Sequence, residues 1–178
     1  MEEWKEYNIG DVCNTISETY KANSSKVVLI NTSDILEGVC LNHNKVDNKD
    51  LKGQFKKVFH QYDILYSEIR PANKRFAFIH FNPLNYIAST KLMVIRNNER
   101  ILPEYLYYIL QSKIVIDELQ MLAESRSGTF PQITFSEVSR IPIKLPPLSI
   151  QKVILDILKA LDSKIELNRR INDNLIFN

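Results

Sequence analysis

The sequence predicts an α+β fold: a mixed or antiparallel, β-rich domain with short helices, followed by a long C-terminal helix of coiled-coil character. Three observations predict this fold. Runs dense in β-branched and aromatic residues fill the chain between Val27 and Arg96. A helical spacing of apolar residues takes over after Pro103. A row rich in Ile and Leu, at nearly heptad spacing, begins after Ser149.

The strands are predicted from short apolar or aromatic runs that end at turn-forming residues. The opening segment, Trp4–Ser17, is expected to hold a strand or a short helix, and the polar stretch 37–57 is expected to be a loop. Asn82–Asn85 is expected to be a plain turn between two strands. The predicted strands are Val27–Ile30, Asp63–Ile69, Arg75–Phe81, Tyr86–Thr90, Leu92–Arg96 and Ile141–Leu145.

Helix start signals mark three helices. Pro103 suits the first turn of one helix, and Ser112 and Ser149 suit the N-caps of two more. We expect the broader first half of the apolar face of the last helix to pack against its own domain or a partner. The second half is expected to form a narrower seam with another helix. The row consists of Ile150, Ile154, Ile157, Leu161, Ile165, Asn168, Ile171 and Leu175.

Length and composition indicate one domain with an appendage. We place the boundary between residues 1–146, the globular domain, and residues 147–178, the helix. Hydrophobic residues make up 44% of the chain and charged residues 25%, which is typical of soluble globular proteins. The net charge is only +2, so any surface that attracts polyanions must be local.

The compartment follows from what the chain does not contain. The polar N-terminus does not resemble a signal peptide, and no apolar run approaches the roughly 20 residues that cross a bilayer. Cys13 and Cys40 are far apart and form no CxxC pair, so we expect two reduced thiols. These features predict a cytoplasmic protein without membrane association.

Independent catalysis is not expected. Asn82–Tyr86 superficially resembles the Asn-Pro-Pro-Tyr signature of amino-methyltransferases, but the second proline is missing and no glycine-rich nucleotide turn is present. The carboxylates of Asp63 and Glu68 flank one predicted strand without a third partner, and the three histidines are isolated. We therefore predict no metal and no cofactor for this chain.

Two polar stretches carry residue types that bind nucleic acid. Between residues 52 and 75, six positively charged side chains stand against two carboxylates, beside Gln54 and Asn73. Arg and Lys neutralise phosphates, and Arg, Asn and Gln read base edges. A solvated face without a partner is the alternative. The second stretch, Ser125–Thr129 with Gln132 beyond it, suits either a phosphate contact or a helix-terminal turn with a left-handed Gly128.

A set of motifs in a fixed order then resembles one half of the specificity (S) subunit of type I restriction-modification systems. The resemblance covers nearly the whole chain, although the family more often has acidic residues where this chain has Ser149 and Ile150. The matching segments are Trp4–Val12 (WKEYNIGDV), Tyr62–Ser67 (YDILYS), Pro103–Leu110 (PEYLYYIL), Ser127–Ile133 (SGTFPQI), Ile141–Gln151 (IPIKLPPLSIQ) and Ala160–Asn172 (ALDSKIELNRRIN).

The resemblance implies a non-catalytic targeting role. Residues 1–146 would be a target recognition domain for double-stranded DNA, and the helix would be the conserved spacer that docks methyltransferase (M) subunits. The M subunits would methylate adenine with S-adenosylmethionine, and restriction (R) subunits, reached indirectly, would use ATP and Mg²⁺. Such subunits usually hold two recognition domains and two helices. This chain would therefore be either a dimerising half subunit or the first half of a longer chain.

Charge and residue type, taken together with the resemblance, suggest roles for the polar stretches in binding DNA. Lys56, Lys57 and Lys74 are expected to hold the phosphate backbone. Bases are expected to be read by Gln54, Arg70, Asn73 and Arg75, and the second stretch would add Arg126, Ser127, Thr129 and Gln132. The alternative is an assembly protein that binds no DNA and acts through its C-terminal helix.

Overall fold

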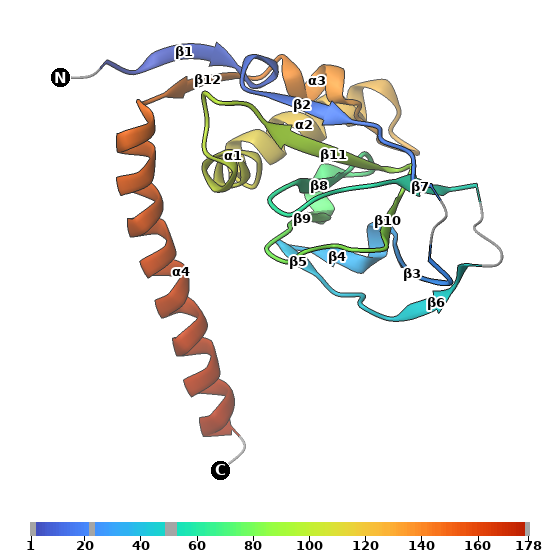
Figure 1. The fold of residues 1–178 in the computed structure, drawn as a ribbon. Coiled ribbons are helices and arrows are strands. Elements are labelled where there is room, and N and C mark those ends of the chain that lie inside the picture. The colour runs from blue at the N-terminus through green and yellow to red at the C-terminus, as the bar shows by residue number, and fades with distance from the viewer. Residues whose placement is uncertain (1–2, 22–23, 49–52, 177–178) are drawn as a thin grey trace.

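The computed structural model describes residues 3–21, 24–48 and 53–176, and the side chains of the last helix as far as residue 173. Within these residues, two four-stranded sheets and three short helices form a globular part, and one long helix extends from it (Figure 1). The sheets contain antiparallel and parallel pairs, so the predicted α+β class with a mixed sheet is confirmed.

One sheet divides the interior into two hydrophobic cores. Its strands run in the order β2 (Cys13–Ile16), β11 (Leu92–Asn97), β8 (Ile64–Ser67) and β9 (Phe76–Phe78), all antiparallel. Alternate side chains of β11 enter opposite cores: Met93 and Ile95 pack under the helices, and Leu92 and Val94 face the second sheet. Burial on both faces explains why this strand reads as a continuous apolar run.

The second sheet covers the other core. Its order is β6 (Lys45–Asp47), β3 (Lys26–Ile30), β10 (Tyr86–Ser89) and β7 (Phe55–Lys57). Strand β10 runs parallel to β3 and antiparallel to β7. The stretch 37–57, predicted to be a loop, therefore contains strands, and that prediction was wrong. Every residue of β6 is exposed, so its sequence lacks an alternating pattern and it depends on pairing with β3.

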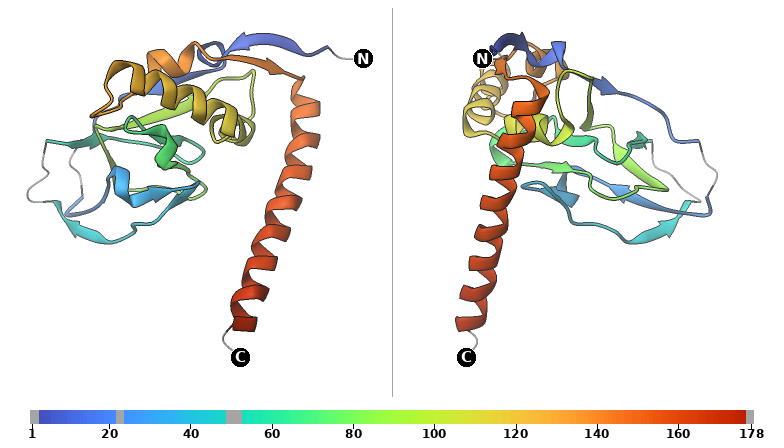
Figure 2. Two further views of the ribbon diagram at one scale, coloured as in Figure 1. Left: turned by 180° about the vertical axis from the view of Figure 1, so that it is seen from behind. Right: turned by 60° about the vertical axis from the view of Figure 1, so that its left-hand side comes forward.

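Three helices close the first core on one side (Figure 2). They are α1 (Pro103–Leu110), α2 (Lys113–Arg126) and α3 (Phe135–Ser139). The predicted cap at Ser112 is confirmed, because its side chain accepts a hydrogen bond from the Val115 backbone at 3.4 Å. The sequence did not reveal α3, although Thr134 and Glu137 form a capping box at its start.

A two-stranded ribbon brings together the first and the last strand of the globular part. Strand β1 (Lys5–Asn8) pairs antiparallel with β12 (Pro142–Leu145), and two residues separate β12 from α4 (Leu148–Ile176). The helix starts one residue before the predicted cap at Ser149, since the carbonyl of Pro147 already accepts the Ile150 and Gln151 amides. The remaining short elements are the 3₁₀ turns η1 (Ile9–Asp11), η2 (Thr32–Asp34) and η4 (Pro71–Asn73), and the hairpin strands β4 (Ile35–Leu36) and β5 (Val39–Cys40).

The β4–β5 turn makes Gly38 a stability determinant. Its φ of +95° lies in the region that favours glycine, and an added Cβ would lie 2.1 Å from the Tyr107 hydroxyl. We expect Gly38→Ala to lower the free energy of unfolding by about 2 kcal/mol in urea titrations. Gly128→Ala is the matched control, because no atom lies within 4 Å of that Cβ position. Equal effects of the two substitutions would contradict this account.

Candidate nucleic-acid interface

Two loops that are distant in sequence lie side by side, and the first of them connects β8 to β9. The Arg70 amide donates to the Pro131 carbonyl at 3.1 Å, and the Arg70 guanidinium donates to the Thr129 carbonyl at 3.2 Å. Ile69 and Gln132 form an isolated antiparallel bridge. The two predicted polar stretches therefore meet, and we call residues 69–75 and 125–132 the loop pair.

Several charged side chains of the loop pair already have partners. Lys74 pairs with Glu37 at 3.0 Å, and Arg126 pairs with Glu137 at 2.5 Å. Both cations are about half exposed, so a phosphate can compete for them, although the Glu137 carboxylate is only 20% exposed. Arg75 differs from them. It is only partly exposed and donates to the carbonyls of Ser33 and Ile35 at 3.3 and 3.2 Å. That geometry gives Arg75 a structural role and weighs against a role in base reading.

Other members of the loop pair remain exposed. Asn73 and Thr129 are exposed, and their side chains form no hydrogen bonds within the described residues. Ser127 accepts the Phe130 amide at 3.1 Å and so shapes the loop. Gly128 does not take the left-handed conformation of the alternative prediction. Polar groups on a fixed backbone can therefore approach a ligand here.

The remaining predicted residues lie on and beside β7, and we call Gln54, Lys56 and Lys57 the β7 group. Gln54 and Lys56 are exposed. Lys57 turns inward, and its ammonium donates to the carbonyls of Thr90 at 3.1 Å and Leu92 at 2.7 Å. Burial lowers the pKa of Lys57, partly offset by the charge of Glu68. Lys57 therefore joins β7 to the β10–β11 turn, and it is poorly placed to bind phosphate.

Lys91 connects the two groups, and the sequence did not single it out. Its exposed ammonium lies 3.3 Å from the Gln132 amide oxygen and 4.0 Å from the Glu68 carboxylate. Its positive charge also contributes to the lowered pKa of Lys57. A signal was present in the sequence, since a lysine follows Thr90 at a tight turn between two strands. Only the fold shows that this turn lies between β7 and the loop pair.

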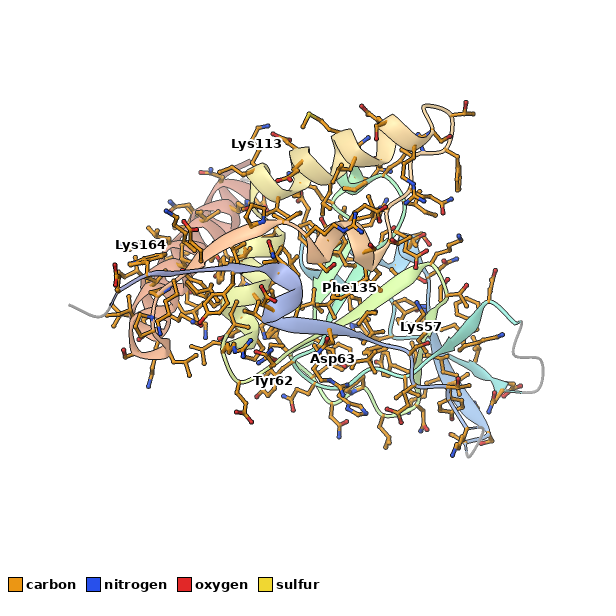
Figure 3. The ribbon with its side chains drawn as sticks, turned by 90° about the horizontal axis from the view of Figure 1, so that it is seen from above. Lys57, Tyr62, Asp63, Lys113, Phe135 and Lys164 are labelled. Atoms are coloured by element: carbon orange, nitrogen blue, oxygen red, sulfur yellow. The ribbon has the colours of Figure 1, made fainter. Side chains whose placement is uncertain are left out.

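Lys57 lies far from the long helix. Figure 3 places Lys57 at one end of the globular part and Lys164 of α4 at the other. The β7 end is therefore free of the helix.

The apolar row of α4 is exposed, but its residues differ in part from those predicted. Gln151 and Leu155 are buried against the domain, and Ile154 packs partly on the same core. Val153, outside the predicted row, is 55% exposed. Asn168 is exposed, and the side chain of Leu175 lies outside the described residues. The apolar row as observed consists of Ile150, Val153, Ile157, Leu161, Ile165 and Ile171, each between 40% and 58% exposed.

An ion pair and a hydrogen bond attach the opposite side of α4 to α1. Lys159 pairs with Glu104 of α1, and the Tyr108 hydroxyl donates to Asp162 at 2.5 Å. These contacts set which face of the helix points outward. Among the described residues, no three His, Cys, Asp or Glu side chains gather as metal ligands, and no helix has the length and apolar character to cross a bilayer.

Comparison with known proteins decides the family. The model of the type I restriction modification DNA specificity domain matches residues 1–175. The chain belongs to this family. The type I restriction enzyme HindI specificity subunit of Haemophilus influenzae is 49% identical over 98% of this chain and 39% of its own length. The chain thus spans less than half of that relative.

Solved structures show the same fold. The HsdS subunit of Thermoanaerobacter tengcongensis matches with a TM-score of 0.79 and 27% identity, over 94% of this chain and 44% of that one. The S subunit from M. genitalium matches with a TM-score of 0.60 at 12% identity, over 94% and 41%. This specificity domain therefore has the expected combination of a mixed-sheet domain and a long helix.

Proposed function

We propose that this specificity domain recognises double-stranded DNA for a type I restriction-modification enzyme. Residues 1–146 are the recognition domain, and residues 147–178 are the spacer helix. The chain directs adenine methylation by M subunits and, through them, restriction by R subunits. S-adenosylmethionine, ATP and Mg²⁺ belong to those partners, and the assembly works in the prokaryotic cytoplasm.

The observation that best supports DNA binding is the convergence of the loop pair and the β7 group around Lys91. Phosphate contacts require accessible cations, and base reading requires exposed amides or guanidiniums on a rigid scaffold. Lys56 and Lys91 supply exposed cations, and Arg70 is held by the backbone of the neighbouring loop. Family membership weighs against an assembly protein that binds no DNA. The interface consists of Gln54, Lys56, Arg70, Asn73, Lys74, Lys91, Arg126, Ser127, Thr129 and Gln132.

The exposed apolar row supports the helical part of the proposal. Six large apolar side chains on one face of a helix are a liability in water unless another helix or a partner covers them. We propose that a second helix covers this row in a coiled-coil-like pair, and that M subunits dock on the result. The second helix belongs to another copy of the chain.

Salt dependence tests DNA binding. We expect the affinity of the chain, assembled with its M subunits, to fall steeply with salt. Lys56→Ala and Lys91→Ala should each weaken binding to every duplex and reduce the slope of log affinity against log salt by about one. Lys113→Ala on α2, an exposed cation outside both proposed surfaces, is the control and should change neither. A complex that binds no duplex, or binds without salt dependence, would overturn the proposal.

A further inference from the structure

The turn between β9 and β10 presents an apolar side chain to solvent on a rigid base. Leu84 is 73% exposed, although the preceding Pro83 is buried. Asn85 has a φ of 65°, a left-handed conformation that costs free energy for a residue with a side chain. Such strain persists only where the surroundings fix the backbone.

Three hydrogen bonds fix this turn. The Tyr86 amide donates to the Pro83 carbonyl at 3.1 Å, and the Val28 amide donates to the Asn85 carbonyl at 2.9 Å. The Tyr20 hydroxyl donates to the Asn85 side-chain oxygen at 3.4 Å. Leu84 therefore projects from a preorganised backbone, and Asn82 directly precedes this fixed segment, which lowers the entropic cost of contacting a ligand.

A surface cleft of about 420 Å³ opens beside the turn. The Asn82 side chain is exposed and forms no hydrogen bond within the described residues. Gln61 uses its amide nitrogen on the His80 carbonyl at 2.8 Å, which leaves its amide oxygen as an acceptor. The lining residues that matter here are Lys21, His60, Gln61, Asn82, Leu84 and Tyr86.

The cleft adjoins the β7 group. The Tyr20 amide donates to the Lys56 carbonyl at 2.8 Å, and Thr19 forms a bridge with Lys57. A duplex held by Lys56 therefore passes close to the turn. Lys21, at the edge of the cleft, adds a second exposed cation for the phosphate backbone.

We propose that the Asn82–Asn85 turn reads an adenine–thymine pair in the major groove. An Asn amide carries a donor and an acceptor side by side, which matches N6 and N7 of adenine. Leu84 supplies the apolar contact that a thymine methyl group favours. The inference rests on the proposed DNA-binding function and adds a reading element that lies outside the loop pair.

Selection from random duplexes tests the reading role. The complex with M subunits is expected to enrich one consensus from a pool of random duplex DNA. Asn82→Ala should reduce discrimination at a single adenine–thymine position by about 5- to 100-fold, because a paired base contact supplies roughly this factor. Leu84→Ala should reduce discrimination at the same position by a smaller factor, because an apolar contact with one methyl group is weaker. Affinity for unrelated duplexes should not change. Ile114→Ala on α2, an 80% exposed apolar residue, is the control and should keep the consensus.

Directed cleavage of the DNA tests where the turn lies on the duplex, without a measurement of affinity. A Leu84→Cys variant, labelled with an iron-chelate cleaving reagent, should cut the selected duplex at the same position. The native thiols interfere little, because Cys13 and Cys40 are buried and burial raises the pKa of Cys13 to about 12. An Ile114→Cys variant labelled in the same way should not cut there.

The outcomes separate the two proposals. A wild-type complex that selects no sequence contradicts DNA recognition itself. A wild-type complex that selects a consensus, with Asn82 and Leu84 variants that keep it, contradicts only the reading role of the turn. Loss of binding to all duplexes by folded variants also contradicts it, because a base-reading side chain leaves phosphate contacts intact. If the label at position 84 does not cleave the selected duplex, the reading role of the turn is likewise contradicted.

Discussion

Arg96→Ala is expected to lower the free energy of unfolding by about 3 kcal/mol, because it leaves a buried carboxylate without its cation. Asp63 is 1% exposed. The Arg96 guanidinium binds it with two hydrogen bonds, Nε to Oδ1 and Nη2 to Oδ2, each 2.7 Å long. The bond to Asp63 also raises the pKa of Arg96 above its usual value.

The position of this ion pair explains the size of the expected effect. It joins the start of β8 to β11, the central strand between the two cores. Asp63 also accepts the His60 amide at 2.7 Å, so the same carboxylate holds the turn before β8. Without Arg96, the carboxylate loses its charged partner and must be hydrated, which opens the turn.

Urea unfolding monitored by circular dichroism measures this effect. The control is Lys113→Ala, which removes an exposed pair with Asp117 on α2 and should cost less than about 0.5 kcal/mol. A double variant, Asp63→Asn with Arg96→Ala, should regain part of the lost stability because the unpaired charge is gone. An Arg96→Ala loss no larger than that of the control would show that the pair is not a stabilising element.

Local signals in the sequence were sufficient where short-range chemistry decides the structure. Ser112 was predicted as an N-cap, and its hydroxyl does cap α2, because a cap depends on residues within one helical turn. The apolar run Leu92–Arg96 was predicted as a strand for a similar reason, and β11 extends one residue beyond it. In both cases the residue types at neighbouring positions determine the conformation.

Long-range contacts decided what the sequence could not predict. Arg75 and Lys57 counted as free positive charges in the sequence, but each binds backbone carbonyls more than 30 residues away. The same limit applies to β6, which is a strand only because β3 lies beside it. On α4 the helical period was correct. The contacts with α1 determine that Ile154 faces the domain and Val153 faces outward.

The apolar row of α4 carries the second large prediction. The wild-type chain should self-associate, and Leu161→Glu should shift it to monomers by more than a hundredfold in the association constant. Leu161 is 52% exposed in the single chain and lies near the middle of the row. Helix pairing would bury two carboxylates without partners, and each costs about 3 kcal/mol or more. Sedimentation equilibrium at several protein concentrations measures the change.

Ser163→Glu separates the effect of position from that of charge. It adds the same carboxylate two residues further along α4. Ser163 lies on the side of α4 that faces α1, where the two helices line a surface cleft. A helix can pair through the apolar row only if that row faces the partner, so a charge on the other side should leave the association constant nearly unchanged. If both variants dissociate equally, net charge and not the row controls assembly. If Leu161→Glu remains associated, the copies meet through another surface, and α4 is left to bind partners of a different kind.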